Sequence, residues 1–175
     1  IRDRHNARRY LDFGITSCIS AAAAKPRLDI VIRNAINAGE IPGPRLLACS
    51  PWLTVTGGLG DERKLHMPLV ESMALVVDGP ENYRVTTREL IREGVDIIKL
   101  VISGDTFMEH APSTSTVMSE AEVAAAADEG AGGGGTANER PVWVEGDPTH
   151  GPRPSCTRRL QGAFSESIFF IADEQ

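Results

Sequence analysis

The feature that most constrains the fold is a run from Val95 to Ser103 that is apolar almost throughout. Continuous Ile, Val and Leu runs are typical of parallel strands that helices cover. Lys99 lies in the middle of this run, and lysine is almost never fully buried without a partner, because an unpaired charge there costs several kcal/mol. The run therefore predicts an α/β fold, and Lys99 is its most informative residue.

The strand pattern alone leaves two explanations of Lys99 open. In the first, the side chain is buried, and because burial disfavours the charged form, the neutral amine is available to form a Schiff base or to capture carbon dioxide as a carbamate. In the second, Lys99 lies near the end of the strand and its head reaches into solvent. The pattern does not favour one over the other.

Helix-like and strand-like segments alternate up to about residue 127, which is typical of repeated βα units. The sequence predicts helices over 4–13, 27–38, 80–93 and 121–127, and strands over 15–20, 45–50 and 95–103. The last of these helices begins with a capping box from Ser119 to Glu122. Two connections have no clear period, residues 51–79 (the first loop) and 104–117 (the second loop). Loops this long inside a domain are often functional.

Composition excludes several classes of function. The net charge is -6 and no basic stripe occurs, which argues against a nucleic-acid surface. No apolar stretch approaches the roughly 20 residues of a membrane span, and the first residues do not resemble a secretory signal. The three cysteines lack the spacing of a zinc site or a disulfide scaffold. We therefore expect a soluble, cytoplasmic protein with reduced cysteines.

Candidate site residues lie in the two loops, because ligands of parallel α/β folds bind at the carboxyl ends of the strands. The first loop carries Gly57 and Gly58, which allow close approach of backbone amides to a ligand, and Asp61 beside them. The second loop carries Asp105 and His110. These signals are weak, since the glycine spacing fits no phosphate-binding motif and loop flexibility explains it equally well. Asp105 and His110 are residue types found more often in turns or on the surface than as ligands.

Several motifs together resemble one known family. They are Ile41–Leu47 (IPGPRLL), Leu53–Gly58 (LTVTGG), Gly94–Lys99 (GVDIIK) with Ser103–Asp105 (SGD), and Val117–Val123 (VMSEAEV). In this order and spacing they resemble the metal-dependent amidohydrolase superfamily, in its imidazolonepropionase-like and prolidase-like branch. The resemblance runs from about residue 4 to 128, and the combination is more specific than any single motif.

The resemblance implies a (β/α)8 TIM barrel, of which this chain would hold strands 2 to 4 with their helices and a degraded C-terminal portion. It also implies that Lys99, on the fourth barrel strand, is a carboxylated lysine that bridges two divalent metals, usually zinc. A metal-held hydroxide would then cleave a C–N bond of a small amide or dipeptide-like substrate.

The chain also departs from the family pattern. The family's His-x-His pair on the first strand would precede Ile1, and its later aspartate would follow Gln175. Neither candidate later strand, 142–145 or 167–170, contains the expected histidine. His150 matches no motif position, so only Lys99 of the metal-ligand set is present. We therefore expect an enzyme fragment that is inactive as this chain.

The character of the sequence changes after Asp128, where a glycine run is followed by a stretch rich in Pro, Gly and Arg. We divide the chain into residues 1–128, a partial amidohydrolase barrel, and residues 129–175, an atypical segment that is either out of frame or a divergent subdomain. Short strands at 142–144 and 167–172 are the only regular structure expected in the second part.

Two other functions remain open. The chain could be a non-catalytic binding or assembly protein derived from a barrel, pairing as a homo-oligomer through exposed strand edges. A less favoured alternative is an enzyme of aldolase type, in which Lys99 forms a Schiff base with a carbonyl substrate.

Overall fold

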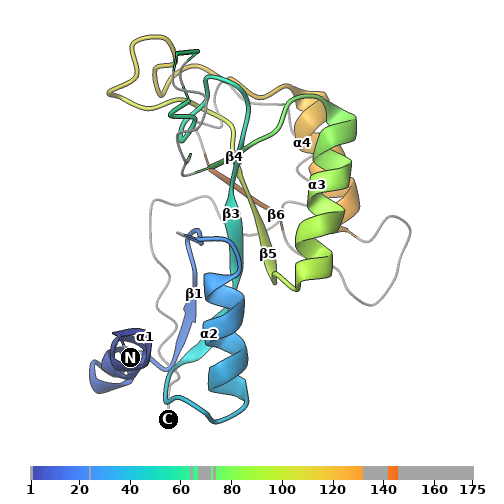
Figure 1. Cartoon of the computed structure of the whole chain (residues 1–175). Helices are drawn as coiled ribbons and strands as arrows, with labels where there is room; N and C mark the ends of the chain where they lie inside the picture. Colours follow the sequence, from blue (N-terminus) through green and yellow to red (C-terminus); the bar gives the residue numbers. More distant parts are fainter. Residues whose placement is uncertain are drawn as a thin grey trace.

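The computed structural model describes residues 2–23, 25–63, 65–66, 72, 74–131 and 142–145, which form a mixed α/β fold (Figure 1). The helices are α1 (Arg2–Asp12), α2 (Leu28–Asn37), α3 (Pro80–Glu93) and α4 (Glu120–Gly130). The strands are β1 (Ser17–Ile19), β2 (Arg45–Leu47), β3 (Cys49–Thr54), β4 (Ala74–Val76), β5 (Ile97–Val101) and β6 (Val142–Glu145). Among the described helices, none has the length and apolar character needed to cross a bilayer.

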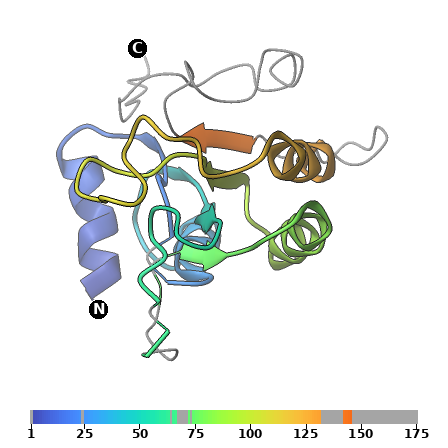
Figure 2. The ribbon, with the colours of Figure 1, turned by 90° about the horizontal axis from the view of Figure 1, so that it is seen from above.

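All pairs of these strands are parallel. One sheet contains β1 and β2, and the other has the order β4-β3-β5-β6. Helix α2 connects β1 to β2, α3 precedes β5, and α4 lies between β5 and β6 in the sequence. Seen from above, α3 and α4 lie together on one side of the strands (Figure 2). The carboxyl ends of β3 and β5 therefore point to the same end of the sheet, where both loops lie (Figure 1).

The four predicted helices are confirmed, and their ends follow the predicted local signals. Pro80 occupies the first turn of α3, and Gly94 ends that helix with a left-handed φ of 95°. Helix α4 begins with the complete capping box, in which the Ser119 side chain accepts from the Glu122 N–H. The strand expected at 142–144 is confirmed as β6, in register with β5. The strand expected at 167–172, and His150, lie outside the described residues.

One prediction about the first loop is wrong. Its beginning and end are not loop but strand, because β3 continues to Thr54 and β4 forms over Ala74–Val76. Pro51 concealed β3 in the sequence, since proline cannot donate to a strand ladder and argues against a central strand. The structure accommodates Pro51 with a shift of the β3–β5 register between Cys49 and Trp52.

The apolar core lies between the sheet and the helices. Ile98 and Leu100 of β5 are fully buried, in one cluster with Tyr83 of α3 and Val123 of α4. Every residue of β5 is buried, so the prediction of a strand covered on both faces is confirmed. Because side chains alternate along a strand, Lys99 points to the face opposite Ile98 and Leu100.

A polar contact holds the opposite, amino-terminal end of the strands. Arg33 of α2 donates to the Asp96 carboxylate and, at 2.9 Å, to the carbonyl of Gly94. The same Asp96 carboxylate accepts the N–H of Ala48 at 2.8 Å. Ala48 is the single residue between β2 and β3, so this contact ties α2, the break between the two sheets and the start of β5 together.

Glu122 joins the beginnings of two helices. Its Oε1 accepts the N–H of Gly79, just before α3, at 2.8 Å. Its Oε2 accepts the N–H and the hydroxyl of Ser119 at 2.8 and 2.7 Å. Glu122 is 8% exposed, whereas Gly79 is partly buried and Ser119 is exposed. The carboxylate therefore fixes α3 and α4 relative to each other at the end of the sheet that carries the loops.

We predict that Glu122→Ala lowers the free energy of unfolding by about 1 to 3 kcal/mol, because it removes half of a capping box and leaves the partly buried Gly79 N–H without its acceptor. The matched control is Glu120→Ala, since Glu120 is an exposed acid in the same first turn. Glu120→Ala should lower the free energy of unfolding by only about 0.5 kcal/mol. Urea unfolding of the three proteins measures both effects, and equal losses would contradict the role of Glu122.

Candidate functional site

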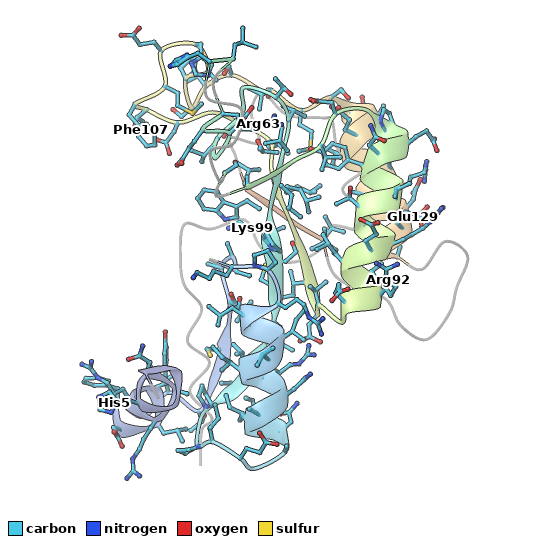
Figure 3. The ribbon with its side chains drawn as sticks, in the orientation of Figure 1. His5, Arg63, Arg92, Lys99, Phe107 and Glu129 are labelled. Atoms are coloured by element: carbon cyan, nitrogen blue, oxygen red, sulfur yellow. The ribbon has the colours of Figure 1, made fainter. Side chains whose placement is uncertain are left out.

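Lys99 is buried at the centre of the sheet and is only 3% exposed (Figure 3). The alternative in which its head reaches solvent is therefore wrong. Its backbone N–H donates to the Ser50 hydroxyl of β3 at 2.9 Å. Its register neighbour on β3 is Trp52, and Nζ lies 6.0 Å from the centroid of the Trp52 ring. That distance is within the range of a cation–π contact.

The face of the sheet that carries Lys99 holds several buried polar side chains beside the apolar Ile97 and Val101, which alternation places on the same face. Leu53 of β3 belongs to the apolar core, so alternation places its neighbours Trp52 and Thr54 on the other face. The buried polar residues on this face of β3 and β5 and at their ends are Ser50, Thr54, Lys99 and Ser103. We call Ser50, Trp52, Thr54 and Lys99 the polar face.

Sequence reasoning missed the β3 members of the polar face. The signal was the alternation of Ser50, Trp52 and Thr54 with other residues, which has the period of a strand. The loop prediction for residues 51–79 rested on the lack of a clear period, and the short alternation, which Pro51 interrupts, was not recognised as a strand. Only the pairing of β3 with β5 brings these side chains beside Lys99.

Two side chains of the polar face have buried polar atoms without a hydrogen-bond partner in the described part of the chain. These atoms are Nε1 of Trp52 and Oγ1 of Thr54. Buried polar atoms in folded proteins are nearly always hydrogen-bonded, so each such atom requires an explanation. Both atoms are on the side of the sheet where Lys99 lies.

The structure brings three of the predicted loop residues together above the sheet. The Gly57 N–H donates to the Asp61 carboxylate at 2.9 Å. The Gly57 carbonyl lies 3.2 Å from Nε2 of His110, which connects the first loop to the second. Asp105 instead accepts from the N–H and hydroxyl of Thr106, within its own turn.

Gly58 is required by the packing beneath this loop cluster. A Cβ at this position would lie 2.3 Å from Oγ1 of Thr54 and 3.2 Å from a methyl group of Val117. Gly58 thus allows the first loop to fold directly over the polar face. The close approach seen here is to the protein's own side chains, and the expected approach of the glycine amides to a ligand stays a prediction.

Asp61 has a structural role within its loop. Its carboxylate accepts from the Arg63 guanidinium at 2.7 and 3.1 Å and from the Arg63 N–H at 3.2 Å. The hydrogen bonds from Arg63, with that from Gly57, lower the pKa of Asp61 to about 2 against the opposing effect of burial. Asp61 is therefore ionised at neutral pH, and its oxygens are occupied by donors of the same loop.

The described residues do not by themselves form a metal centre. No group of three or more His, Cys, Asp and Glu side chains that could hold an ion occurs within the described part of the chain. Lys99 is the one residue of the expected ligand set that the structure places at the sheet. The expectation of two metals concerns the intact family member, to which this chain was expected to contribute Lys99 alone, and it stays a prediction.

Solved structures resemble the chain over most of its length. A prolidase in complex with N-methylphosphonate-L-proline is 29% identical with a TM-score of 0.62, and the match covers 86% of this chain and 36% of the prolidase. An amidohydrolase is 26% identical with a TM-score of 0.66, over 88% of this chain and 37% of that protein. Ochratoxinase of A. niger is 23% identical with a TM-score of 0.65, over 82% and 34%, a likeness of fold alone.

The chain thus spans about a third of the length of these proteins. No protein-family model matches it, and the sequences of curated proteins give no match either.

We predict that Asp61→Asn lowers the melting temperature by a few degrees at pH 6, because the amide cannot replace the charged pair with Arg63. The pKa of Asp61 lies below its ordinary value of 3.8, so its contribution to stability is complete above that pH and is lost as the pH falls through about 2. Thermal unfolding from pH 2 to 7 should show the difference between wild type and variant disappearing at the acid end. The control is Glu62→Gln, an exposed neighbour, and a difference independent of pH would refute the prediction.

Proposed function

We propose that the whole protein hydrolyses C–N bonds of small cyclic amides or dipeptide-like substrates, with Lys99 as a functional residue. The proposal follows from the membership of this chain among the amidohydrolase- and prolidase-like proteins. The observation that carries the proposal is the burial of Lys99 on the polar face of the central strand. The proposal concerns the whole protein, because this chain spans only about a third of the length of the proteins that it resembles.

The strand order supports placing this chain in a (β/α)8 barrel. Strands β1, β2 with its continuation β3, β5 and β6 follow one another in the sequence, and each pairs in parallel with the next. A doubly wound sheet reverses its order at a switch point, whereas a barrel adds each strand beside the last. The described strands follow the barrel order, with β4 as an addition beside β3. We propose that they correspond to barrel strands 2 to 5.

The proposed state of Lys99 is the carbamate. The neutral Nζ attacks the carbon of carbon dioxide, and an N–C bond forms as one C–O π bond breaks and its electron pair moves to oxygen. A proton then leaves the nitrogen for water. The product carries a negative charge and two acceptor oxygens in place of a positive charge. Such a group is an oxygen ligand for divalent metals. Two metals, zinc by family resemblance, remain a proposal for the whole protein, because further ligands would have to come from outside the described residues.

The alternative roles make different chemical demands on Lys99. A Schiff-base enzyme would use the same buried amine as nucleophile toward a carbonyl substrate. A binding or assembly protein would need no reactive lysine. The burial of Lys99 supports chemistry over pure assembly, because a lysine at the centre of a buried strand is costly and serves no packing purpose.

We predict that Lys99→Arg abolishes carboxylation. The chain, incubated with ¹³C-bicarbonate, should show a carbamate resonance that is absent from Lys99→Arg and present in Lys25→Arg, the control at an exposed lysine. In the full-length protein, Lys99→Arg should reduce hydrolysis of dipeptide-like amides by at least roughly a hundredfold.

Trapping with borohydride and a carbonyl compound separates the alternatives. A reduced adduct on Lys99, together with no carbamate resonance, would replace the hydrolase proposal with a Schiff-base enzyme. If neither the adduct nor the carbamate is detected, a binding or assembly role is the explanation that remains.

A further inference from the structure

We propose that Trp52 is a positioning residue for Lys99, and that its indole N–H donates a hydrogen bond to a carbamate oxygen on that lysine. The inference rests on the proposed function, because it requires the carboxylated form of Lys99. It assigns a role to a side chain that the sequence placed in a loop and that the family resemblance did not mark.

The geometry places the two side chains together. Trp52 and Lys99 are register partners on the paired strands β3 and β5, and in-register residues of parallel strands point to the same face. Nζ lies 6.0 Å from the centre of the indole ring. Nζ lies over the ring, whereas the indole N–H points outward in the plane of the ring. A carbamate extends the lysine side chain by one carbon and two oxygens, and the proposal requires one of these oxygens to reach the ring edge that carries Nε1.

The hydrogen-bonding chemistry requires an acceptor at this place. Nε1 of Trp52 is buried and has no partner in the described part of the chain. An indole nitrogen can only donate, and an ammonium group can only donate as well. The Lys99 ammonium therefore cannot satisfy Trp52, whereas its carbamate can. Carboxylation converts the neighbour of an unsatisfied donor into the acceptor that this donor lacks.

The backbone around Trp52 restricts the position of its ring. Trp52 pairs with Ala74 of β4 as well as with Lys99 of β5, so its strand has neighbours on both edges. A Cβ at Gly60 would lie 3.2 Å from a ring carbon of Trp52, so the first loop packs closely on the indole. On the other strand, the hydrogen bond from the Lys99 N–H to Ser50 fixes the backbone of β5. The donor and the lysine are therefore held in place before carboxylation occurs.

The acceptor for the Trp52 N–H is either a carbamate oxygen on Lys99 or a buried water. Only in the first case does removal of the N–H weaken carboxylation, so the bicarbonate concentration needed for half-occupancy of Lys99 separates the two. The test variant is Trp52→Phe, which keeps an aromatic ring and removes the N–H. The matched control is Tyr83→Phe, which removes another buried polar atom that has no hydrogen-bond partner among the described residues, on the helix-facing side of the sheet. Both proteins are titrated with ¹³C-bicarbonate at one pH, and the carbamate resonance is measured.

We expect Trp52→Phe to need roughly ten to a hundred times more bicarbonate for half-occupancy, the effect of losing one hydrogen bond to a charged acceptor. Tyr83→Phe should remain within about twofold of wild type. An unchanged titration of Trp52→Phe overturns the positioning role and leaves the carbamate proposal standing. Absence of the resonance in wild type overturns the proposed function itself.

A second measurement uses the wild-type chain, in case Trp52→Phe does not fold. The indole N–H resonances of ¹⁵N-labelled protein are recorded before and after bicarbonate is added, and the resonance of Trp52 is assigned by its absence from a Trp52→His spectrum or by selective labelling. A downfield shift of the Trp52 proton that follows carbamate occupancy supports the hydrogen bond. Carboxylation without any shift of that proton contradicts it.

Discussion

The structure depends on the pairing of β3 with β5, which buries a lysine between two strands. Both faces of β5 are covered, so an amine at its centre cannot reach water. A protein tolerates this only where the surroundings compensate the charge or the chemistry removes it. The aromatic ring of Trp52 lies on the same face of the sheet as Lys99, and the Ser50 hydroxyl accepts the backbone N–H of Lys99. The pairing of β3 with β5 therefore decides which side chains surround this lysine.

The two faces of the sheet serve different purposes. The helix-facing side is packed with apolar residues from α3 and α4, and the Glu122 carboxylate fixes the beginnings of these helices. The other side carries the polar face together with the apolar Ile97 and Val101. The first loop closes this side from above, and Asp61 and Gly58 hold that loop in its shape.

Local signals predicted the helices well and the loop-bound site residues less well. The helix ends are set by short-range geometry at Pro80, Gly94 and the Ser119 capping box. Such local signals can be recognised from the sequence alone. Asp61 and His110 were predicted as substrate-loop candidates, but their contacts with Arg63 and Gly57 depend on how the loops fold back. A carboxylate in a sequence does not show whether its oxygens are already occupied.

The sequence by itself determined that the chain is built from βα units, that a lysine interrupts its most apolar strand, and that its motifs resemble one family. These are properties of periodicity and order along the chain, which need no knowledge of contacts. Only the tertiary structure decided that β3 passes through Pro51 and that Trp52 and Thr54 stand on the same side as Lys99. That juxtaposition joins residues far apart in the chain through strand register, and register is fixed by packing and not by local sequence.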